Sequence, residues 1–274
     1  MDFTSPEGEQ RYAALVRAAS SAVVALDFDG TLSPIVDDPE ASDVLVELAG
    51  AVAAVAVVTG RPARQALALG GLDDVGNLIG EGGKELYLFG QYGNERWTST
   101  QRRVISPRPP HGLATFLREL PRALRSVDAG DAFVEDKGLA VAVHTRRLED
   151  PEAAFERLLP KLRDLAEQHD LVVEPGRNVI EIRSHGMHKG LVVRTLVEEL
   201  EAGAFLFAGD DLGDLEAFEA VGELAREGMP TLLVCSASTE ESRLAALADV
   251  VVKGPEGVLD LLRQLATDAR DAKA

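Results

Sequence analysis

A chain of 274 residues can form one large α/β domain, or a core domain with a smaller second one, and its 46% hydrophobic residues can fill a sizeable core. The formal net charge of −18 argues against a nucleic-acid partner, because binding to a phosphate backbone requires a basic surface. An anionic substrate would therefore have to be attracted by a metal ion or a local basic cluster.

The single cysteine, Cys235, excludes an internal disulfide, and its place in an apolar run predicts a buried strand thiol. The sequence has no apolar stretch of about 18 residues or more, so we expect no membrane span and no membrane partner. The acidic N-terminus does not resemble a signal peptide, and the expected location is cytoplasmic. The sequence leaves the oligomeric state open, and a monomer is compatible with it.

Short apolar runs alternate with helical segments along most of the chain. Strands are predicted over residues 22–26, 52–58, 204–208, 231–235 and 250–252, and helices over 40–49, 62–69, 189–201, 212–221 and 255–265. This alternation indicates an α/β fold in which a parallel sheet carries helices on both faces. The charged, alanine-rich tail from residue 267 to 274 is expected to fray.

The middle of the chain has a different pattern, which begins after Pro107, Pro109 and Pro110. Helices are predicted over 112–120 and 151–169, and strands over 133–137, 139–145, 171–174 and 179–183. Their order predicts a small α+β domain inserted at residues 107–185, with residues 1–106 and 186–274 forming the core domain. The glycine-containing segment 184–188 is the expected hinge.

The first predicted strand leads into Asp27-Phe28-Asp29-Gly30-Thr31. Because side chains alternate along a strand, Asp27 and Asp29 are expected to converge at its carboxyl end, where open α/β sheets bind ligands. Two carboxylates this close repel each other unless a cation lies between them, and carboxylate oxygens suit Mg²⁺. The alternative is an Asx turn with Asp29 or Thr31 as a helix N-cap, and this motif alone does not decide between them.

Two further segments carry groups that suit a phosphate. Thr59, which follows the second predicted strand and precedes Gly60, can hydrogen-bond a phosphate oxygen or can simply cap the next helix. Lys189 opens a predicted helix, where the helix dipole disfavours a cation. A neighbouring anionic site would explain Lys189, and a solvated side chain is the alternative.

A second acidic group follows the strand predicted at 204–208. Asp210 is placed to bind a metal ion, and Asp211 and Asp214 to orient its waters. A calcium loop of the EF-hand type is excluded because a strand precedes the acids and the other spaced ligands and the terminal Glu are missing.

In chain order, Asp27, Thr59, Lys189 and Asp210 resemble the four motifs of the haloacid dehalogenase (HAD) superfamily. The resemblance is narrowed by four segments that are similar to trehalose-phosphate phosphatases, which cleave trehalose 6-phosphate: 26–34, 134–146, 174–183 and 186–190. It covers residues 22–262. It implies a Rossmann-like HAD core with a parallel sheet and an inserted α+β cap domain that sets substrate specificity.

The resemblance also implies a two-step reaction with Mg²⁺ as cofactor. Asp27 would attack phosphorus to form an aspartyl-phosphate, and Asp29 would protonate the departing sugar and then activate water. Thr59 and Lys189 would bind the phosphoryl group, while Asp27, the backbone carbonyl of Asp29, and Asp210 would hold Mg²⁺. Cap closure would exclude bulk water.

The family's cap implies which side chains bind sugar hydroxyls. By motif position these are Glu95, Lys137 and Glu181, followed by His144 and Arg146. For Lys137 and Glu181 the alternative is that both are exposed charges on a sheet face.

Two positions depart from the family pattern. Tyr92 replaces the histidine of Gly-x-His-Gly-x-Glu, which puts the role of that position in doubt. Thr145 replaces the tyrosine of His-Tyr-Arg, so an aromatic contact to the sugar is expected to be missing.

Two other functions fit parts of the pattern. A HAD phosphatase for sucrose phosphate or mannosyl-phosphoglycerate, or a phosphomannomutase, would share the core residues and differ in the cap. A phospho-accepting signalling receiver also places acids, Thr and Lys at strand ends. The inserted segment and Asp29, which supplies the acid for turnover, disfavour a receiver.

Overall fold

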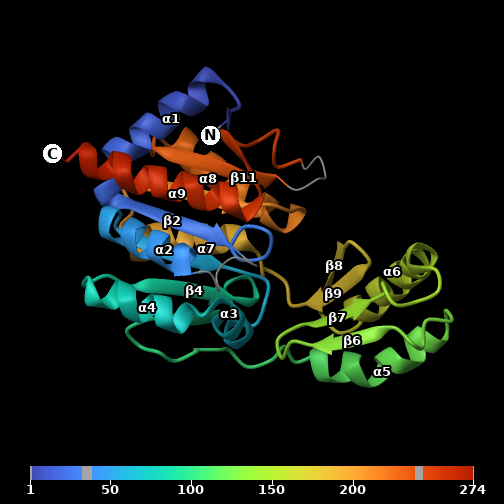
Figure 1. The fold of residues 1–274 in the computed structure, drawn as a ribbon. Helices are drawn as coiled ribbons and strands as arrows, with labels where there is room; N and C mark the ends of the chain where they lie inside the picture. Colours follow the sequence, from blue (N-terminus) through green and yellow to red (C-terminus); the bar gives the residue numbers. More distant parts are fainter. Residues whose placement is uncertain (1, 33–38, 238–242, 274) are drawn as a thin grey trace. The chain divides into compact units, whose positions relative to one another are not determined.

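The computed structural model describes residues 2–32, 39–237 and 243–273, and the chain divides into two compact units (Figure 1). The first unit comprises Met1–Ser106 and His188–Ala274, and the second unit comprises Pro107–Met187. The predicted insertion at 107–185 ends two residues before the second unit does.

The first unit is built on an eight-stranded sheet with the order β1-β12-β11-β10-β2-β3-β4-β5. The six strands from β12 to β4 run parallel, and β1 and β5 pair antiparallel at the two edges. Every residue of β2, β3 and β10 is buried, which explains why these strands are continuous apolar runs. The strands are β1 (Asp2–Phe3), β2 (Ala22–Asp27), β3 (Ala54–Val58), β4 (Leu86–Gly90), β5 (Glu95–Thr98), β10 (Ala204–Gly209), β11 (Thr231–Ala237) and β12 (Val250–Lys253).

Helices cover both faces of this sheet. On one face, apolar side chains of α1, α2, α3, α4 and α9 pack against strand residues such as Leu26 and Val57. On the other face, α7 and α8 pack against residues such as Ala25 and Phe207. The helices are α1 (Pro6–Arg17), α2 (Pro39–Ala51), α3 (Ala63–Gly70), α4 (Leu72–Glu81), α7 (Lys189–Glu199), α8 (Leu215–Arg226) and α9 (Gly254–Asp271), with 3-10 turns η1 (Ala19–Ser21), η3 (Gln91–Gly93) and η4 (Leu212–Asp214).

The predicted α/β fold with a parallel central sheet is confirmed, but several elements differ. The helix expected over 212–221 is a 3-10 turn followed by α8. The tail does not fray from residue 267, because α9 continues to Asp271 and buries Leu265, Ala266 and Ala269. Strands β1, β4 and β5 and helices α1 and α4 lie outside the predicted elements.

The second unit is an antiparallel four-stranded sheet with the order β6-β7-β9-β8 and two helices on one face. Val141, Val143, Ile180 and Ile182 face the helices. Because side chains alternate along a strand, Glu181 projects from the opposite face of the sheet. The elements are α5 (Leu113–Arg125), β6 (Phe133–Asp136), β7 (Val141–His144), α6 (Pro151–Glu167), β8 (Val172–Gly176) and β9 (Val179–Arg183).

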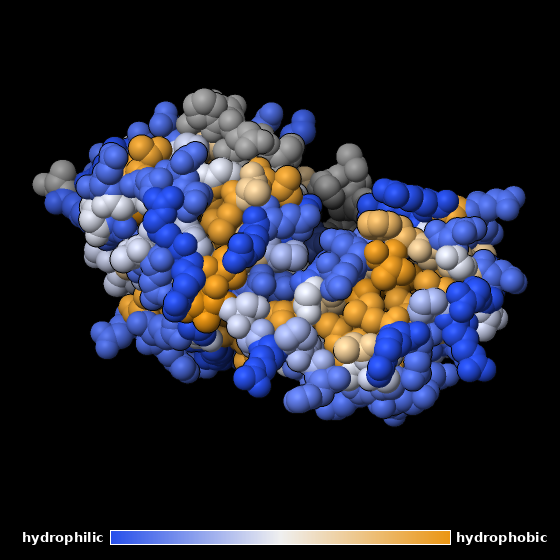
Figure 2. Space-filling view, turned by 90° about the horizontal axis from the view of Figure 1, so that it is seen from below, coloured by the Kyte–Doolittle hydropathy of each residue, from blue (hydrophilic) through white to orange (hydrophobic). Residues whose placement is uncertain are grey.

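Two expectations from composition concern the core and the surface. Cys235 is a buried thiol in β11, as predicted. Within the described ranges, no helix is long and apolar enough to cross a membrane. Figure 2 shows hydrophilic residues over much of the face that it displays, with hydrophobic residues gathered in several areas between them.

Candidate active site

Three neighbouring parallel strands bring the predicted residues to one edge of the sheet. Strand β2 lies between β10 and β3, with Leu26 opposite Ala208 and Asp27 opposite Val58. Because the three strands are parallel and these pairs lie at their carboxyl ends, the residues at the ends of the strands and just beyond them share one edge of the sheet. Asp27, Thr59 and Asp210 are among them.

Lys189, the first residue of α7, joins two buried carboxylates. Its Nζ lies 2.5 Å from Oδ1 of Asp27 and 2.6 Å from Oδ1 of Asp214. The side chain of Lys189 is only 5% exposed, so the alternative of a solvated lysine is wrong. These contacts explain why a cation occupies a helix N-terminus, because the attraction of two carboxylates outweighs the repulsion by the helix dipole.

Asp210 completes a group of three carboxylates. One oxygen each from Asp27, Asp210 and Asp214 lies within 4.8 Å of the others. Gly30, at φ +76°, makes this approach possible, because a Cβ at that position would collide with the carboxylate of Asp210. The hydroxyl of Ser236, in β11, donates a hydrogen bond of 2.7 Å to the carbonyl of Gly30 and fixes the turn.

The site carries more negative charge than one lysine neutralises. Burial raises the pKa of Asp27 well above its usual range, Asp214 adds to this, and Lys189 opposes it. Burial, with the nearby charges of Asp211 and Asp214, raises the pKa of Asp210 to about 7. Burial opposes the charge of Lys189, but the carboxylates of Asp214 and Asp27 outweigh it and raise the pKa of the lysine. An additional cation would relieve this imbalance.

The residues fit a divalent cation. Oδ1 of Asp210 is buried and has no hydrogen-bond partner among the described residues. Asp214 is differently placed: its Oδ1 accepts from Lys189, and its Oδ2 accepts from the amide of Asp210 at 3.0 Å. Oxygens of Asp27 and Asp210 are therefore the better candidate ligands, and Asp214 orients Lys189 and the loop.

Asp211 and Asp214 stabilise the turn after β10. They form a reciprocal capping box around η4, in which Asp211 also accepts the amide of Gly213 at 2.8 Å. This arrangement fixes the backbone that presents Asp210. A role of either acid in orienting metal-bound water stays a prediction.

The convergence of Asp27 and Asp29 stays a prediction, and the structure gives Asp29 a cationic partner of its own. The side chain of Asp29 is 48% exposed and pairs with Arg61, whose Nε lies 2.6 Å from Oδ2 and whose Nη2 lies 2.5 Å from Oδ1. Strand β2 ends at Asp27, and beyond that residue the alternation of a strand no longer sets side-chain direction.

Thr59 is buried and belongs to the loop that carries Arg61. Its Oγ1 accepts the amide of Arg61 at 3.1 Å, which leaves the hydroxyl proton available to an acceptor. Helix α3 begins at Ala63 and its N-cap is Pro62, so the alternative of Thr59 as N-cap is wrong. In the family-like stretch 26–34, residues 33 and 34 lie outside the described residues.

The residues predicted to bind sugar all have partners within their own unit. Oε2 of Glu95 accepts the amide of Ala63 at 2.6 Å and so caps the start of α3. Nζ of Lys137 lies 2.6 Å from Oε2 of Glu181, and these side chains are 14% and 9% exposed. The alternative of exposed sheet-face charges is therefore wrong for Lys137 and Glu181.

The further candidates belong to the same unit: His144 is the last residue of β7, and Arg146 lies in the turn that follows. His144 Nε2 lies 2.9 Å from Oε2 of Glu135 on the neighbouring strand, and Arg146 Nη2 donates to the carbonyl of Arg177 at 3.3 Å. Thr145 is fully buried, so a threonine at this position packs inside the unit. A sugar-binding role for any of these residues stays a prediction.

A family model described as trehalose-phosphatase matches residues 25–252. The chain belongs to the trehalose-phosphatase family. A protein of Mycobacterium tuberculosis described as an uncharacterized glycosyl hydrolase is 34% identical over 98% of this chain and 20% of its own length. A trehalose-phosphate phosphatase of Mycobacterium avium is 33% identical over 77% of this chain and 54% of its own length. The predicted family is thus confirmed.

Solved structures confirm the fold of this family member. The C-terminal domain of trehalose-6-phosphate phosphatase from C. albicans matches with a TM-score of 0.71 at 19% identity, over 97% of this chain and 98% of that one. A haloacid dehalogenase-like hydrolase from Bacteroides thetaiotaomicron matches with a TM-score of 0.61 at 13% identity, over 89% of this chain and 99% of that one. The chain spans a fifth to about half the length of the curated relatives described above.

The trehalose-phosphatase fold here also carries site residues that sequence reasoning missed. Arg61 follows Thr59-Gly60, and an arginine directly after that pair was the available signal for a partner of Asp29. Ser236 gave no signal beyond its place at the end of an apolar strand. The role of Asp214 in holding Lys189 could not be read from its spacing to Asp210.

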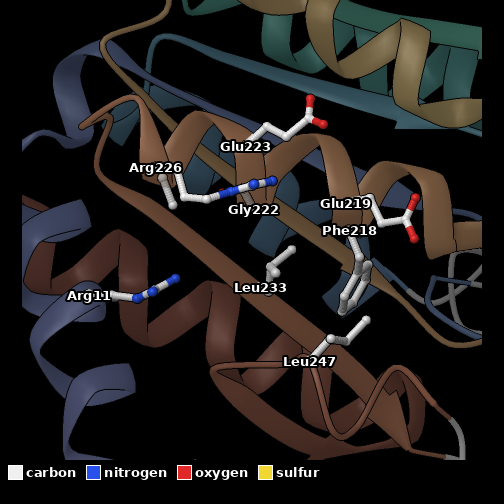
Figure 3. Close-up of a pocket in the computed structure, with 9 residues that line it drawn as sticks. Arg11, Phe218, Glu219, Gly222, Glu223, Arg226, Leu233 and Leu247 are labelled. Carbon is white, nitrogen blue, oxygen red and sulfur yellow. The ribbon is translucent and has the colours of Figure 1, made fainter.

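A separate pocket of about 520 Å³ lies on the first unit (Figure 3). Apolar side chains of Phe218, Leu233 and Leu247 line it, and Arg11 and Arg226 reach it from α1 and α8. As far as the chain is described, its lining includes none of the predicted site residues. The chemistry therefore has to be sought at the carboxylate group and not at this pocket.

Proposed function

We propose that the protein hydrolyses trehalose 6-phosphate to trehalose and inorganic phosphate, with Asp27 as the nucleophile. One observation carries the proposal: Lys189 lies within hydrogen-bond distance of a buried aspartate at the carboxyl edge of the sheet, in a chain of the trehalose-phosphatase family. Both a nucleophile and a phosphate-binding cation are then present at one point.

In the first step, an oxygen of Asp27 forms a bond to phosphorus as the bond from phosphorus to the sugar oxygen breaks. Lys189 offsets the repulsion between the carboxylate and the phosphoryl oxygens. The hydroxyl of Thr59 donates to a phosphoryl oxygen. Mg²⁺, held by Asp27, Asp210 and the backbone carbonyl of Asp29, would supply further positive charge for the same purpose.

Asp29 carries the proton in both steps. It protonates the departing sugar oxygen, which would otherwise leave as an alkoxide, and then accepts a proton from the water that attacks the aspartyl-phosphate. Phosphate leaves and the carboxylate of Asp27 is restored. The test is release of phosphate by the purified protein from trehalose 6-phosphate, sucrose 6-phosphate, mannosyl-phosphoglycerate and mannose 6-phosphate. We expect the highest kcat/KM for trehalose 6-phosphate, and no release from any of them would overturn the proposal.

Metal dependence gives a prediction with a readout other than activity. Mg²⁺ at about 100 times its Kd should stabilise the wild-type protein by about 2.7 kcal/mol, and Asp210→Asn should lose most of that gain. Thermal unfolding with Mg²⁺ and with chelator measures both. Phosphate release should stop in excess chelator, and full activity there would show that the reaction needs no metal ion.

Specificity gives a second prediction. Glu181→Gln keeps the volume of the side chain but alters its pair with Lys137 and any contact to a sugar hydroxyl. We expect kcat/KM for trehalose 6-phosphate to fall about 10- to 100-fold, because a site built to hydrogen-bond a hydroxyl is left mispaired. Hydrolysis of a small aryl phosphate, which has no sugar, should change little.

The matched control for this prediction is Glu152→Gln, an exposed glutamate in the first turn of α6. It should leave both substrates unaffected. Equal losses on the two substrates in Glu181→Gln would mean that Glu181 only stabilises its own unit.

A further inference from the structure

The pair between Arg61 and Asp29 has the geometry of a two-point clamp. Nε and Nη2 of Arg61 each meet a different oxygen of Asp29, at 2.6 and 2.5 Å. Such a pair fixes the plane of the carboxylate as well as its position. The two side chains are partly exposed, at 34% and 48%, so stabilisation of the fold alone is a weak reason for the pair.

The loop that carries Arg61 is held on both sides of the residue. The amide of Arg61 donates to Oγ1 of Thr59 at 3.1 Å, and its carbonyl accepts the amide of Gln91 at 2.8 Å. The carbonyl of Thr59 accepts the amide of Tyr92 at 3.0 Å. These hydrogen bonds fix the backbone of Arg61 independently of the contact between its side chain and Asp29.

The partner segment adopts a costly backbone to make these bonds. Gln91 and Tyr92 have φ of 46° and 58°, and Gly93 follows at 97°. Gly60 closes the arrangement, because a Cβ there would lie 2.7 Å from the ring of Tyr92. Residues other than glycine that adopt a left-handed backbone conformation cost free energy, and they persist where the surrounding structure requires that conformation. Here they hold the loop that carries Arg61.

The position of Asp29 suits a general acid. In an in-line displacement the leaving oxygen departs from the side of phosphorus opposite the nucleophile. The acid that protonates it therefore has to face the leaving oxygen, and Asp29 is not a member of the described group of three carboxylates formed by Asp27, Asp210 and Asp214. Each oxygen of Asp29 that accepts from Arg61 keeps a second lone pair, which can hold the transferred proton.

We propose that Arg61 is a positioning residue that holds the carboxylate of Asp29 where it can protonate the leaving sugar oxygen. The inference rests on the proposed phosphatase function and adds a residue to it. Lysine cannot replace the two-point contact, because its ammonium is a single point charge.

Leaving groups of different basicity separate this role from phosphate binding. An alkyl phosphate needs a proton on its departing oxygen, whereas 4-nitrophenyl phosphate releases a stable anion without one. For Arg61→Gln we expect kcat/KM on trifluoroethyl phosphate to fall about 10- to 100-fold. On 4-nitrophenyl phosphate the loss should stay below about threefold. Arg61→Lys should behave like Arg61→Gln on both substrates.

A double-mutant cycle tests whether Arg61 acts through Asp29. In an Asp29→Asn background, Arg61→Gln should cost less than about threefold on trifluoroethyl phosphate, because no acid remains to be positioned. Additive losses in the cycle, or equal losses of Arg61→Gln on both leaving groups, would show that Arg61 binds the phosphate directly and would overturn the proposal. No loss on either substrate would also overturn it.

The matched control is Arg194→Gln. Arg194 lies 2.6 Å from Glu223, with exposures of 33% and 52%, so it is a similarly exposed pair in the same unit. It should leave both rates unchanged. If the wild-type protein hydrolyses none of these phosphates, the proposed function fails. If it does and the cycle is additive, only the role of Arg61 fails.

Discussion

Asp27→Asn is expected to abolish turnover and leave the fold intact. An amide oxygen cannot form the acyl phosphate, so kcat should fall by at least about 10³-fold. The substitution keeps the shape of the side chain and removes one of the carboxylates that crowd Asp210 and Asp214. Without metal, the melting temperature of the variant should therefore equal or exceed that of the wild type. Phosphate release and thermal unfolding, measured on the same preparation, check both parts.

The control for this experiment is Asp43→Asn, an exposed aspartate of α2. It should change neither activity nor melting temperature. Near-normal turnover by Asp27→Asn would remove Asp27 as the nucleophile. A large loss of stability together with the loss of activity would mean that Asp27 acts mainly in the fold.

Lys189→Met should have the largest effect on stability. The substitution leaves Asp27 and Asp214 buried without their shared cation, and an uncompensated buried charge costs about 3–5 kcal/mol. The double variant Lys189→Met/Asp214→Asn removes one of the two uncompensated carboxylates and should recover part of the lost stability. Lys84→Met is the matched control, because among the described residues Lys84 donates only to the carbonyl of Val52, at 2.8 Å, and its loss should cost about 1 kcal/mol.

The effect of Lys189→Met should depend on pH in a definite direction. Burial already raises the pKa of Asp27 and Asp214 in the folded protein, and loss of the lysine raises both further. The folded state then binds more protons than the unfolded state, so its stability falls as pH rises. The free energy of unfolding of Lys189→Met should lie further below that of the wild type at about pH 8 than at about pH 5. Denaturant unfolding at both pH values measures it, and a deficit that is independent of pH would contradict the account.

The core of the site could be predicted because each residue follows a strong local signal. Asp27 is the last residue of one fully buried strand and Asp210 directly follows another, and parallel strands share a carboxyl edge. Lys189 stood out as a cation at a helix start, where the dipole disfavours it.

Contacts that depend on side-chain direction outside regular elements could not be predicted. Asp29 lies past the end of β2, where alternation along the strand no longer fixes side-chain direction, and its partner Arg61 is distant in sequence. The pairing of Lys137 with Glu181 depends on the antiparallel register of a small sheet, and neither residue carries a local sign of it. Similarly, α9 runs to Asp271 because its tail buries apolar side chains, which tertiary packing decides and composition does not.

The most direct test of the central claim is to locate the phosphoryl group on the enzyme. In Asp29→Asn the base for the second step is missing, so an aryl phosphate with a good leaving group should phosphorylate the protein faster than water releases phosphate. Acid quenching, digestion and mass spectrometry should find one phosphoryl group on the peptide that contains Asp27, and none in Asp27→Asn. A phosphoryl group on another residue, or continued phosphate release with no labelled peptide, would contradict the covalent aspartyl-phosphate.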